Sequence, residues 1–208
     1  MESSPPFLTL SVLTLAAYLI GGLPFGYWFV RLAAGRDIRA MGSGNIGATN
    51  VHRTMGRKAG VIVLLLDIAK GFLAVWLAGA TTHRDALAIG LAIVAVMLGH
   101  CYPVFLKFKG GKAVACFIGA FLYAAPLALA ATLAVFVLVV AVSKYISLGS
   151  IIAAAIFPLA VWLIDRTPAP ILLASIFAAA LIIYRHKGNI ARLRAGTENV
   201  FSLKGKAA

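Results

Sequence analysis

The chain contains little cysteine, and that shortage excludes two classes of site. Cys101 and Cys116 are its only cysteines. Two are too few for a disulfide framework or for a zinc site with four cysteine ligands. Both lie beside or within apolar segments. We therefore expect them to be packing residues and expect no metal site built on cysteine.

Acidic residues are also scarce, with six Asp and Glu against nineteen Lys and Arg, for a formal net charge of +13. In a soluble protein this charge would suggest a nucleic-acid partner. Here the basic residues gather between long apolar runs, where the positive-inside rule places them in a membrane protein. We therefore expect no nucleic-acid binding.

What the chain has in excess is apolar residues. They make up 62% of the sequence, and the mean hydropathy is +0.98. A soluble core of this size could not cover so many apolar side chains, so the bilayer is the expected solvent. Residues 1–6 lack the positive region of a secretory signal and lead directly into an apolar run, so we expect the first helix to be retained.

Six apolar runs are long enough to be judged against the ~20 residues that a helix needs to cross a bilayer. They cover about 7–30, 60–80, 86–106, 113–142, 146–164 and 168–184. The first loop, a second loop near Lys109 and the tail after Tyr184 are all strongly basic. The positive-inside rule places all three in the cytoplasm.

Six simple crossings cannot place the first loop and the tail on the same side, because five runs separate them. The 113–142 run contains Pro126, and a proline can end one helix and start the next. We therefore predict an all-α polytopic membrane protein of seven transmembrane helices. Its N-terminus is outside, its C-terminus is cytoplasmic, and helices 4 and 5 meet near Pro126. Of the nineteen Lys and Arg, only Arg84 and Arg166 would then face outside.

The alternative is one straight, tilted helix over 113–142, which would put the tail opposite the first loop. If the run does divide, its first part, 113–124, would be only ~18 Å long. It would then need local thinning, tilt or protein cover in a ~30 Å hydrocarbon core. Asp67 and Lys70 are three residues apart within the second run, so they are expected to pair. Alternatively, Lys70 could reach the cytoplasmic site.

The first basic loop reads Gly-Ser-Gly-Asn-Ile-Gly-Ala-Thr-Asn over 42–50 and is followed by Arg53. Its glycines allow a ligand to approach the backbone, and Ser, Thr and Asn supply neutral hydrogen-bond groups. Arg53 can bind a phosphate or carboxylate through two parallel bonds. The loop therefore predicts an anion site, although a turn with ordinary positive-inside charges is the simpler alternative.

The second loop places Gly110, Gly111 and Lys112 at the start of a helix. Glycines there expose backbone N–H groups, and the helix dipole and the lysine favour an anion. The segment is no Walker nucleotide loop, because Ala113 follows Lys112 where Ser or Thr is required. We predict phosphate binding without ATP. His100, just before this loop, is expected to be a packed histidine, with membership of the site as the alternative.

The third segment follows the last apolar run and carries His186 and Asn189, three residues apart and able to share one helical face. Arg185 and Lys187 flank His186 and disfavour its protonated form, so a neutral imidazole able to accept a proton is expected near pH 7. The basic residues further along the tail are expected to contact anionic lipid. They are Arg192, Arg194, Lys204 and Lys206.

Together the three segments closely resemble the bacterial acyl-phosphate:glycerol-3-phosphate acyltransferase family, and the match covers the whole chain. It rests on S-G-N-I-G-A-T-N with Arg53, on G-H-x-x-P-x-F with F-K-G-G-K-A-V-A, and on H-K-x-N-I-x-R-L-x-x-G-T-E, in that order. The resemblance implies a seven-helix fold and one integral-membrane acyltransferase domain over 1–208. It also implies a location in the bacterial cytoplasmic (inner) membrane, with the active site on the cytoplasmic side.

The resemblance further implies transfer of a fatty acyl group from acyl phosphate to the sn-1 hydroxyl of glycerol 3-phosphate. The products are lysophosphatidic acid and inorganic phosphate, an early step of phospholipid synthesis. Acyl-CoA, acyl carrier protein, a metal and a cofactor are not expected. The implied ligands of glycerol 3-phosphate are Ser43, Arg53, Lys112, His186 and Asn189. Gly110 and Gly111 would shape its phosphate pocket, Asn45, Gly47, Thr49 and Asn50 would surround the acyl phosphate, and Glu198 would fix the tail.

Two other acyl-transfer mechanisms have no support in the residues. None of the four histidines is followed by Asp at the H-x-x-x-x-D spacing that more widespread glycerolipid acyltransferases use, and there is no G-x-S-x-G nucleophile motif. Acyl phosphate is an activated donor, so direct attack without an acyl-enzyme is expected. His186 or a phosphate oxygen of the donor would take the proton. A transporter of organic phosphates and a purely structural lipid-binding protein are the alternative classes.

Overall fold

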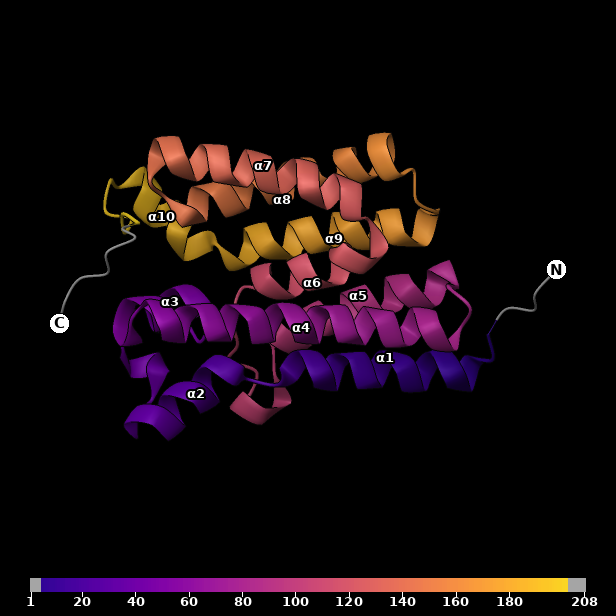
Figure 1. Ribbon diagram of the computed structural model, residues 1–208, viewed down its shortest axis with the longest axis horizontal. Coiled ribbons are helices and arrows are strands. Elements are labelled where there is room, and N and C mark those ends of the chain that lie inside the picture. Colours follow the sequence, from indigo (N-terminus) through magenta and orange to yellow (C-terminus); the bar gives the residue numbers. More distant parts are fainter. Residues whose placement is uncertain (1–4, 202–208) are drawn as a thin grey trace.

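The structure is a computed structural model that describes residues 5–201, and every regular element in that range is helical (Figure 1). The helices are α1 (Phe7–Gly22), α2 (Phe25–Ala34), α3 (Ala48–Met55), α4 (Arg57–Thr81), α5 (Ala86–Cys101), α6 (Val114–Ala124), α7 (Pro126–Ser143), α8 (Ile146–Ala160), α9 (Ala169–Arg185) and α10 (Lys187–Arg194). Short 3₁₀ turns occupy Ile38–Ala40 and Val104–Leu106, and a π-helical turn, Val161–Asp165, extends α8.

The described residues contain five helices that are long and apolar enough to cross a membrane. They are Phe7–Ala34, Arg57–Thr81, Ala86–Leu106, Pro126–Ser143 and Ile146–Asp165. A sixth candidate is α9 with α10, two helices that meet at an angle of 54°. The expectation of an all-helical, multi-span membrane protein is therefore confirmed, with five to six candidate spans.

The first apolar run was expected to be one helix, but it breaks at Leu23 and Pro24, between α1 and α2. Proline has no N–H to continue the ladder, so a carbonyl of the preceding turn loses its partner. The ammonium of Lys70 donates to the Leu23 carbonyl at 2.7 Å and lies 2.8 Å from Oδ1 of Asp67. The predicted pairing of Asp67 with Lys70 is confirmed. Lys70 is buried, and its ammonium lies at the break between α1 and α2, 5.5 Å from the centroid of the Phe25 ring.

The 113–142 run breaks where predicted, because α6 ends at Ala124 and α7 begins at Pro126. The N–H of Ala128 donates to Asp165 at 2.6 Å, whereas Lys144, after the other end of α7, accepts from the N–H of Phe201 at 2.7 Å. Lys112, just before α6, contacts Asn189 at that same end. The chain therefore reverses direction between α6 and α7 (Figure 1).

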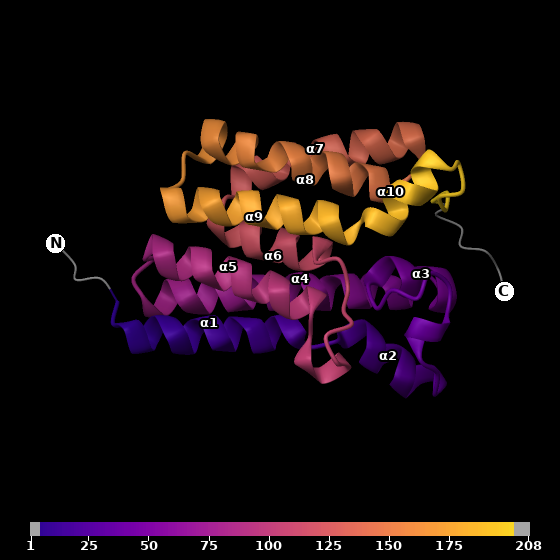
Figure 2. The same cartoon turned by 180° about the vertical axis from the view of Figure 1, so that it is seen from behind.

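The short helix α6 lies between two layers, with α7, α8 and α9 on one side and α1, α4 and α5 on the other (Figures 1 and 2). It packs closely on α4, where a Cβ on Gly119 would overlap the Ile68 carbonyl and a Cβ on Gly71 would overlap the Cys116 carbonyl. Small residues that let two backbones approach in this way are typical of helix pairs in membranes. The short helix α6 is therefore packed between other helices along much of its length.

Other boundaries differ from the apolar runs for local reasons. The run over 86–106 ends as an α-helix at Cys101, and Pro103 and a 3₁₀ turn follow. The run over 146–164 contains Pro158 and finishes in the π-helical turn. Hydropathy measures solvent preference rather than hydrogen bonding, so it could not detect either change.

His100, Cys101 and Cys116 lie in the interior, as expected for packing residues. Both cysteines are buried and unpaired by disulfide. Nδ1 of His100 lies 3.5 Å from Sγ of Cys116 and 3.9 Å from Oδ1 of Asp67. His100 is therefore a packed histidine, and its other ring nitrogen faces the backbone of Gly111.

Candidate active site

Four segments that are far apart in sequence meet at one end of the bundle, around α3 and α10 in Figure 1. They are the loop leading into α3, the loop between α5 and α6, the turn between α7 and α8, and the tail after α9. Hydrogen bonds join three of them: Arg185 with the second loop, Lys112 with Asn189, Ser147 with Glu198, and Phe201 with Lys144. The fourth is joined through α3, where the ring of His52 lies 6.1 Å from the ring of Phe201 in the tail. The three basic segments predicted to share a face are therefore close neighbours.

The first loop is built around the side chain of Asn50, which is only 1% exposed. Its amide nitrogen donates to the carbonyls of Met41 and Asn45, at 2.9 and 2.8 Å, and its oxygen accepts from the N–H of Ser43 at 2.8 Å. Asn45 accepts in turn from the N–H of Gly47. These bonds hold the loop in one shape, so the amide of Asn50 is occupied by the loop itself.

Three polar side chains of this segment remain available to a ligand. Ser43, Thr49 and Arg53 are exposed, and within residues 5–201 their side chains make no hydrogen bond. Thr49 lies in the first turn of α3, where backbone N–H groups of a helix lack intrahelical partners. The segment therefore offers a ligand the hydroxyls of Ser43 and Thr49 and, one helical turn after Thr49, the guanidinium of Arg53.

The second loop differs from its prediction in one respect. The N–H groups of Gly110 and Gly111 were expected to be exposed, but they donate to the carbonyls of Cys101 and His100, at 3.1 and 3.0 Å. Their own carbonyls accept from Arg185, at 2.9 and 3.0 Å. The two glycines therefore shape the loop, but their N–H groups are not available to a ligand. A Cβ on Gly111 would overlap the ring of His100, so only glycine fits there.

Lys112 is the basic group of this loop that faces the tail. Its ammonium donates to Oδ1 of Asn189. Burial, together with the positive charges of Arg192, Arg185 and Arg53, lowers the pKa of Lys112 to about 8, against the opposing charge of Glu198. Like charges so close together disfavour one another, and a bound anion would relieve this repulsion. The site is therefore electrostatically suited to a phosphate.

His186 stands at the junction of α9 and α10 and is 3% exposed. Its Nδ1 lies 2.8 Å from the Ile182 carbonyl, which can only accept, so Nδ1 carries the proton and Nε2 keeps a free lone pair. Burial, and next to it the neighbouring charge of Lys112, lowers the pKa of His186 to about 4. The imidazole is therefore neutral near pH 7.

Asn189 and Glu198 form the centre of the tail. Nδ2 of Asn189 donates to Oε1 of Glu198 at 2.7 Å, which turns its oxygen toward Lys112. Glu198 also accepts from Ser147 at 3.1 Å and from Arg192 at 2.7 Å. A single carboxylate thus orients Asn189 and ties the tail to α8 and α10.

Three of these residues had only weak signals in the sequence. Arg185 was read only as a charge beside His186, Ser147 was not singled out, and Arg192 was assigned to lipid, although it pairs with Glu198. Arg185 and Ser147 act on segments far away in the sequence, which only the fold brings close, whereas Arg192 pairs with Glu198 six residues along the same tail. Arg194 is exposed, and Lys204 and Lys206 lie outside the described residues. Within residues 5–201, no three His, Cys, Asp or Glu side chains gather as a metal site would require.

Comparisons with known proteins agree on one family. Residues 11–196 match the sequence profile of "Glycerol-3-phosphate acyltransferase". A protein of that name from Syntrophotalea carbinolica is 47% identical over 91% of this chain and 96% of its own length. Its namesake from Geobacter sulfurreducens is 48% identical, with the same coverage of both chains.

Two solved structures are also similar to this one. Both are of PlsY, described as an integral membrane glycerol 3-phosphate acyltransferase. Its glycerol 3-phosphate form is 39% identical with a TM-score of 0.88, and its lysophosphatidic acid form is 37% identical with a TM-score of 0.85. Each match covers 93% of this chain and 96% of the other.

Proposed function

The chain belongs to the glycerol-3-phosphate acyltransferase family, and on that premise we propose its acyl donor, the roles of its site residues and its orientation in the membrane. It is an integral membrane enzyme that acylates glycerol 3-phosphate to lysophosphatidic acid. The donor in our proposal is acyl phosphate, without acyl-CoA, acyl carrier protein, metal or other cofactor. The whole chain, 1–208, acts as one domain.

The observation that carries this proposal is the crowding of positive charge around Lys112 in a partly buried site. Two phosphates must be brought together there, one on each substrate, and the mutual repulsion of the cations favours that occupancy. The sn-1 hydroxyl oxygen attacks the acyl carbonyl carbon, a new ester C–O bond forms, and the C–O bond to phosphate breaks. Inorganic phosphate leaves, and no acyl-enzyme intervenes.

We assign the acceptor to the side chains that converge from the three basic segments. They are Ser43, Arg53, Lys112, His186 and Asn189. Arg53 and Lys112 supply charge to the phosphate of glycerol 3-phosphate, while Asn189, oriented by Glu198, holds Lys112 in place. Gly110 and Gly111 shape the pocket through their bonds with His100, Cys101 and Arg185.

The donor phosphate is assigned to the first loop and to the start of α3. Asn45, Gly47 and Thr49 surround it, with N–H groups of the first turn of α3 available to the phosphate or to the developing oxyanion. Asn50 contributes by fixing the shape of this loop, because its own amide is occupied.

Two groups can take the proton of the attacking hydroxyl. Nε2 of His186 has a free lone pair, but a pKa of about 4 makes it a weak base before substrates bind. Phosphate anions beside it would raise that pKa. The alternative base is a phosphate oxygen of the donor.

A His186→Gln variant separates these bases, because glutamine keeps hydrogen bonding without the same basicity. If His186 is the base, the maximal rate at saturating substrates should fall by a factor on the order of 10²–10⁴. A normal maximal rate with a raised KM for glycerol 3-phosphate would assign His186 to binding and the proton to the donor.

In the membrane, we propose seven crossings, with α6 and α7 counted separately because the chain reverses at Pro126. The N-terminus is then outside, and the C-terminus and the active site face the cytoplasm. The membrane is the cytoplasmic (inner) membrane of a bacterium. The shortness of α6, which is covered by protein on both sides, is compatible with a crossing of this kind.

The direct test supplies purified protein with acyl phosphate and glycerol 3-phosphate and follows phosphate release. We expect release only when both substrates are present, with lysophosphatidic acid formed in equal amount. A transporter of organic phosphates would give uptake into vesicles and no such release. Substitution of acyl-CoA for acyl phosphate should give no product.

A further inference from the structure

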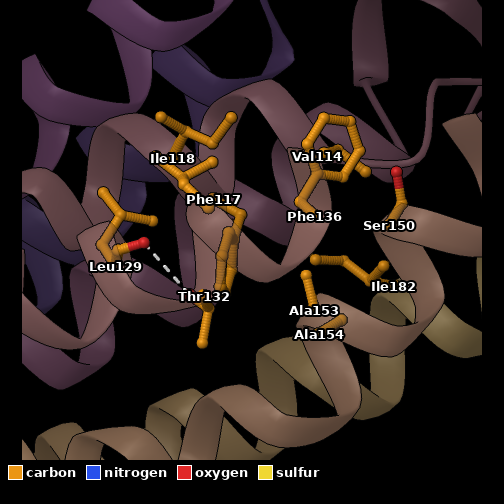
Figure 3. A pocket seen from close by; sticks show the side chains of 11 residues that line it. Val114, Phe117, Ile118, Leu129, Thr132, Phe136, Ser150, Ala153, Ala154 and Ile182 are labelled. Atoms are coloured by element: carbon orange, nitrogen blue, oxygen red, sulfur yellow. Dashed lines mark hydrogen bonds between the residues drawn. The ribbon is translucent and has the colours of Figure 1, made fainter. Parts of the chain in front are cut away.

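The turn over residues 103–109, which we call the lateral turn, projects sideways from the bundle next to α1 and α2 (Figures 1 and 2). Inside the bundle, apolar side chains surround a small cavity between α6, α7, α8 and α9 (Figure 3). In the lateral turn they face outward instead, because Val104, Phe105 and Phe108 are 45%, 52% and 59% exposed. Apolar side chains grouped on a surface indicate a partner, which is either lipid or another protein.

The lateral turn is fixed to the bundle on its inner side. Leu106 is buried and belongs to the same apolar cluster as Ile46 of the first loop and Val51 of α3. The ring of Phe105 lies at the end of α1, where a Cβ on Gly22 would meet it at 3.4 Å. The turn therefore holds a fixed position, with its exposed side chains pointing away from the protein.

The backbone of the lateral turn is paired within itself. The N–H groups of residues 106–111 all donate to carbonyls within residues 100–106, at 2.9–3.2 Å. Lys107 and Phe108 adopt the left-handed backbone, with φ of 52° and 61°, which is uncommon for residues with a side chain. Unpaired backbone groups are costly beside hydrocarbon, so pairing of these N–H groups allows the turn to lie against lipid.

The lateral turn also carries two cations. Lys107 and Lys109 are exposed, and within residues 5–201 neither ammonium makes a hydrogen bond or an ion pair. The acidic side chains in that range are bound elsewhere: Asp37 to Arg39, Asp67 to Lys70, Glu198 to Arg192, and Asp85 and Asp165 to N–H groups near helix starts. The anion that complements the two lysines therefore comes from outside the described chain. Lysines beside apolar side chains suit an anionic lipid surface.

We propose that the lateral turn inserts Val104, Phe105 and Phe108 into the leaflet on the active-site side and binds anionic lipid headgroups through Lys107 and Lys109. Lipid is the partner we choose because α1, which adjoins the turn, belongs to a candidate span and exposes large apolar side chains. Lipid around α1 is thus continuous with lipid around the turn. The proposal requires an integral membrane protein and is independent of the acyl donor.

The first measurement locates the turn relative to lipid. Both native cysteines are buried, so bimane can be attached selectively at Phe108→Cys or at Asn199→Cys, an exposed control in the tail. In vesicles of phosphatidylcholine and phosphatidylglycerol, lipid with a nitroxide on its acyl chain should quench the label at position 108 about threefold more than that at 199. Aqueous iodide should give the reverse order.

Two results of this measurement would overturn insertion. Quenching at position 108 by iodide alone would place the turn in water. Protection from both quenchers would show that a second copy of the chain or another protein covers it. Val104→Cys repeats the measurement if the thermal midpoint of Phe108→Cys shows that it does not fold.

The second measurement tests the lysines, with the label at position 108 and the nitroxide on either phosphatidylglycerol or phosphatidylcholine. The double variant Lys107→Ser with Lys109→Ser should lower the preference for the anionic lipid by about fivefold for each lysine. Salt at about 1 M should remove the preference from the protein with both lysines. Arg57→Ser with Lys58→Ser removes the same charge at the start of α4 and should leave the preference unchanged. Equal preferences in the two double variants would overturn the assignment of Lys107 and Lys109.

Discussion

Lys112 shows how a single residue can be prepared for an anion before the anion arrives. It is partly buried, it faces Asn189, and three arginines act on it with like charge. Burial destabilises the charged form of Lys112, and a bound phosphate stabilises it again. Folding supplies the free energy of that burial, so the charge of Lys112 has no anion to stabilise it until substrate binds.

Removing that charge should weaken the acceptor specifically. We expect Lys112→Met to raise the KM for glycerol 3-phosphate roughly 10- to 100-fold, because one charge-assisted bond contributes about 1.5–3 kcal/mol. Initial rates at varied glycerol 3-phosphate measure this. An unchanged KM for that substrate would refute the assignment of Lys112.

The same residue predicts a pH dependence. A lysine with a pKa of about 8 is charged below pH 8 and neutral above it. Anion binding by Lys112 should therefore be lost as pH rises, and kcat/KM for glycerol 3-phosphate should fall between pH 8 and pH 10. Lys112→Arg keeps its charge throughout this range, so its profile should be flat there. If kcat/KM of Lys112→Arg fell over the same pH range, a group other than residue 112 would be titrating.

Glu198 holds the tail in place through three hydrogen-bond partners. Its removal should therefore lower kcat/KM more than removal of any one of those partners. Glu198→Ala leaves Asn189, Arg192 and Ser147 without their common acceptor. We expect kcat/KM for glycerol 3-phosphate to fall roughly 10- to 100-fold, as for loss of a charged hydrogen-bond partner. Arg194→Ala, on the exposed side of α10, is the matched control and should stay near wild type.

At the scale of helices, the sequence predicted solvent preference well and local geometry poorly. The all-helical class, the break at Pro126 and the pairing of Asp67 with Lys70 follow from hydropathy, proline chemistry and the cost of buried charge. The break at Pro24 was missed because it lies within a run that is apolar throughout. Hydropathy does not register a lost backbone hydrogen bond.

For the site, the motifs predicted which segments matter and in what order, but not which groups remain free. The N–H groups of Gly110 and Gly111 looked available, yet His100 and Cys101 accept from them. Arg185 looked like a surface charge, yet it binds both glycine carbonyls. Pairings across more than seventy residues depend on helix packing, which a single sequence does not encode locally.

The close contact of α4 with α6 is the element-scale feature most sensitive to substitution. Gly119→Ala should destabilise the protein by about 1–3 kcal/mol, because the new methyl group overlaps the Ile68 carbonyl and neither backbone can yield. Ala80→Leu, exposed on α4, adds more volume and should cost little. Thermal unfolding in detergent followed by tryptophan fluorescence measures both. Equal midpoints for Gly119→Ala and wild type would contradict the packing described.

For the whole molecule, the distribution of charge predicts which ends of the helices face the cytoplasm. Both native cysteines are buried, so new cysteines on the surface can be labelled selectively. In intact cells we expect a membrane-impermeant maleimide to label cysteines at Arg84 and Arg166, and to label those at Lys109 and Lys144 only after the membrane is opened. Labelling of positions 109 and 144 from opposite sides would rule out the seven crossings.

The bond between Lys70 and Leu23 bears on how the chain is assembled. Before α4 is in place, the Leu23 carbonyl would accept from the N–H of Phe25 at 3.1 Å but would lack the charge-assisted bond from Lys70, which contributes about 1.5–3 kcal/mol. Its donor lies 47 residues further along the chain, in α4. Synthesis from the N-terminus therefore leaves the bent first span incomplete until α4 has followed it. The two segments should be integrated as a pair, and a truncation that stops before Lys70 should leave a first span that membrane proteases degrade.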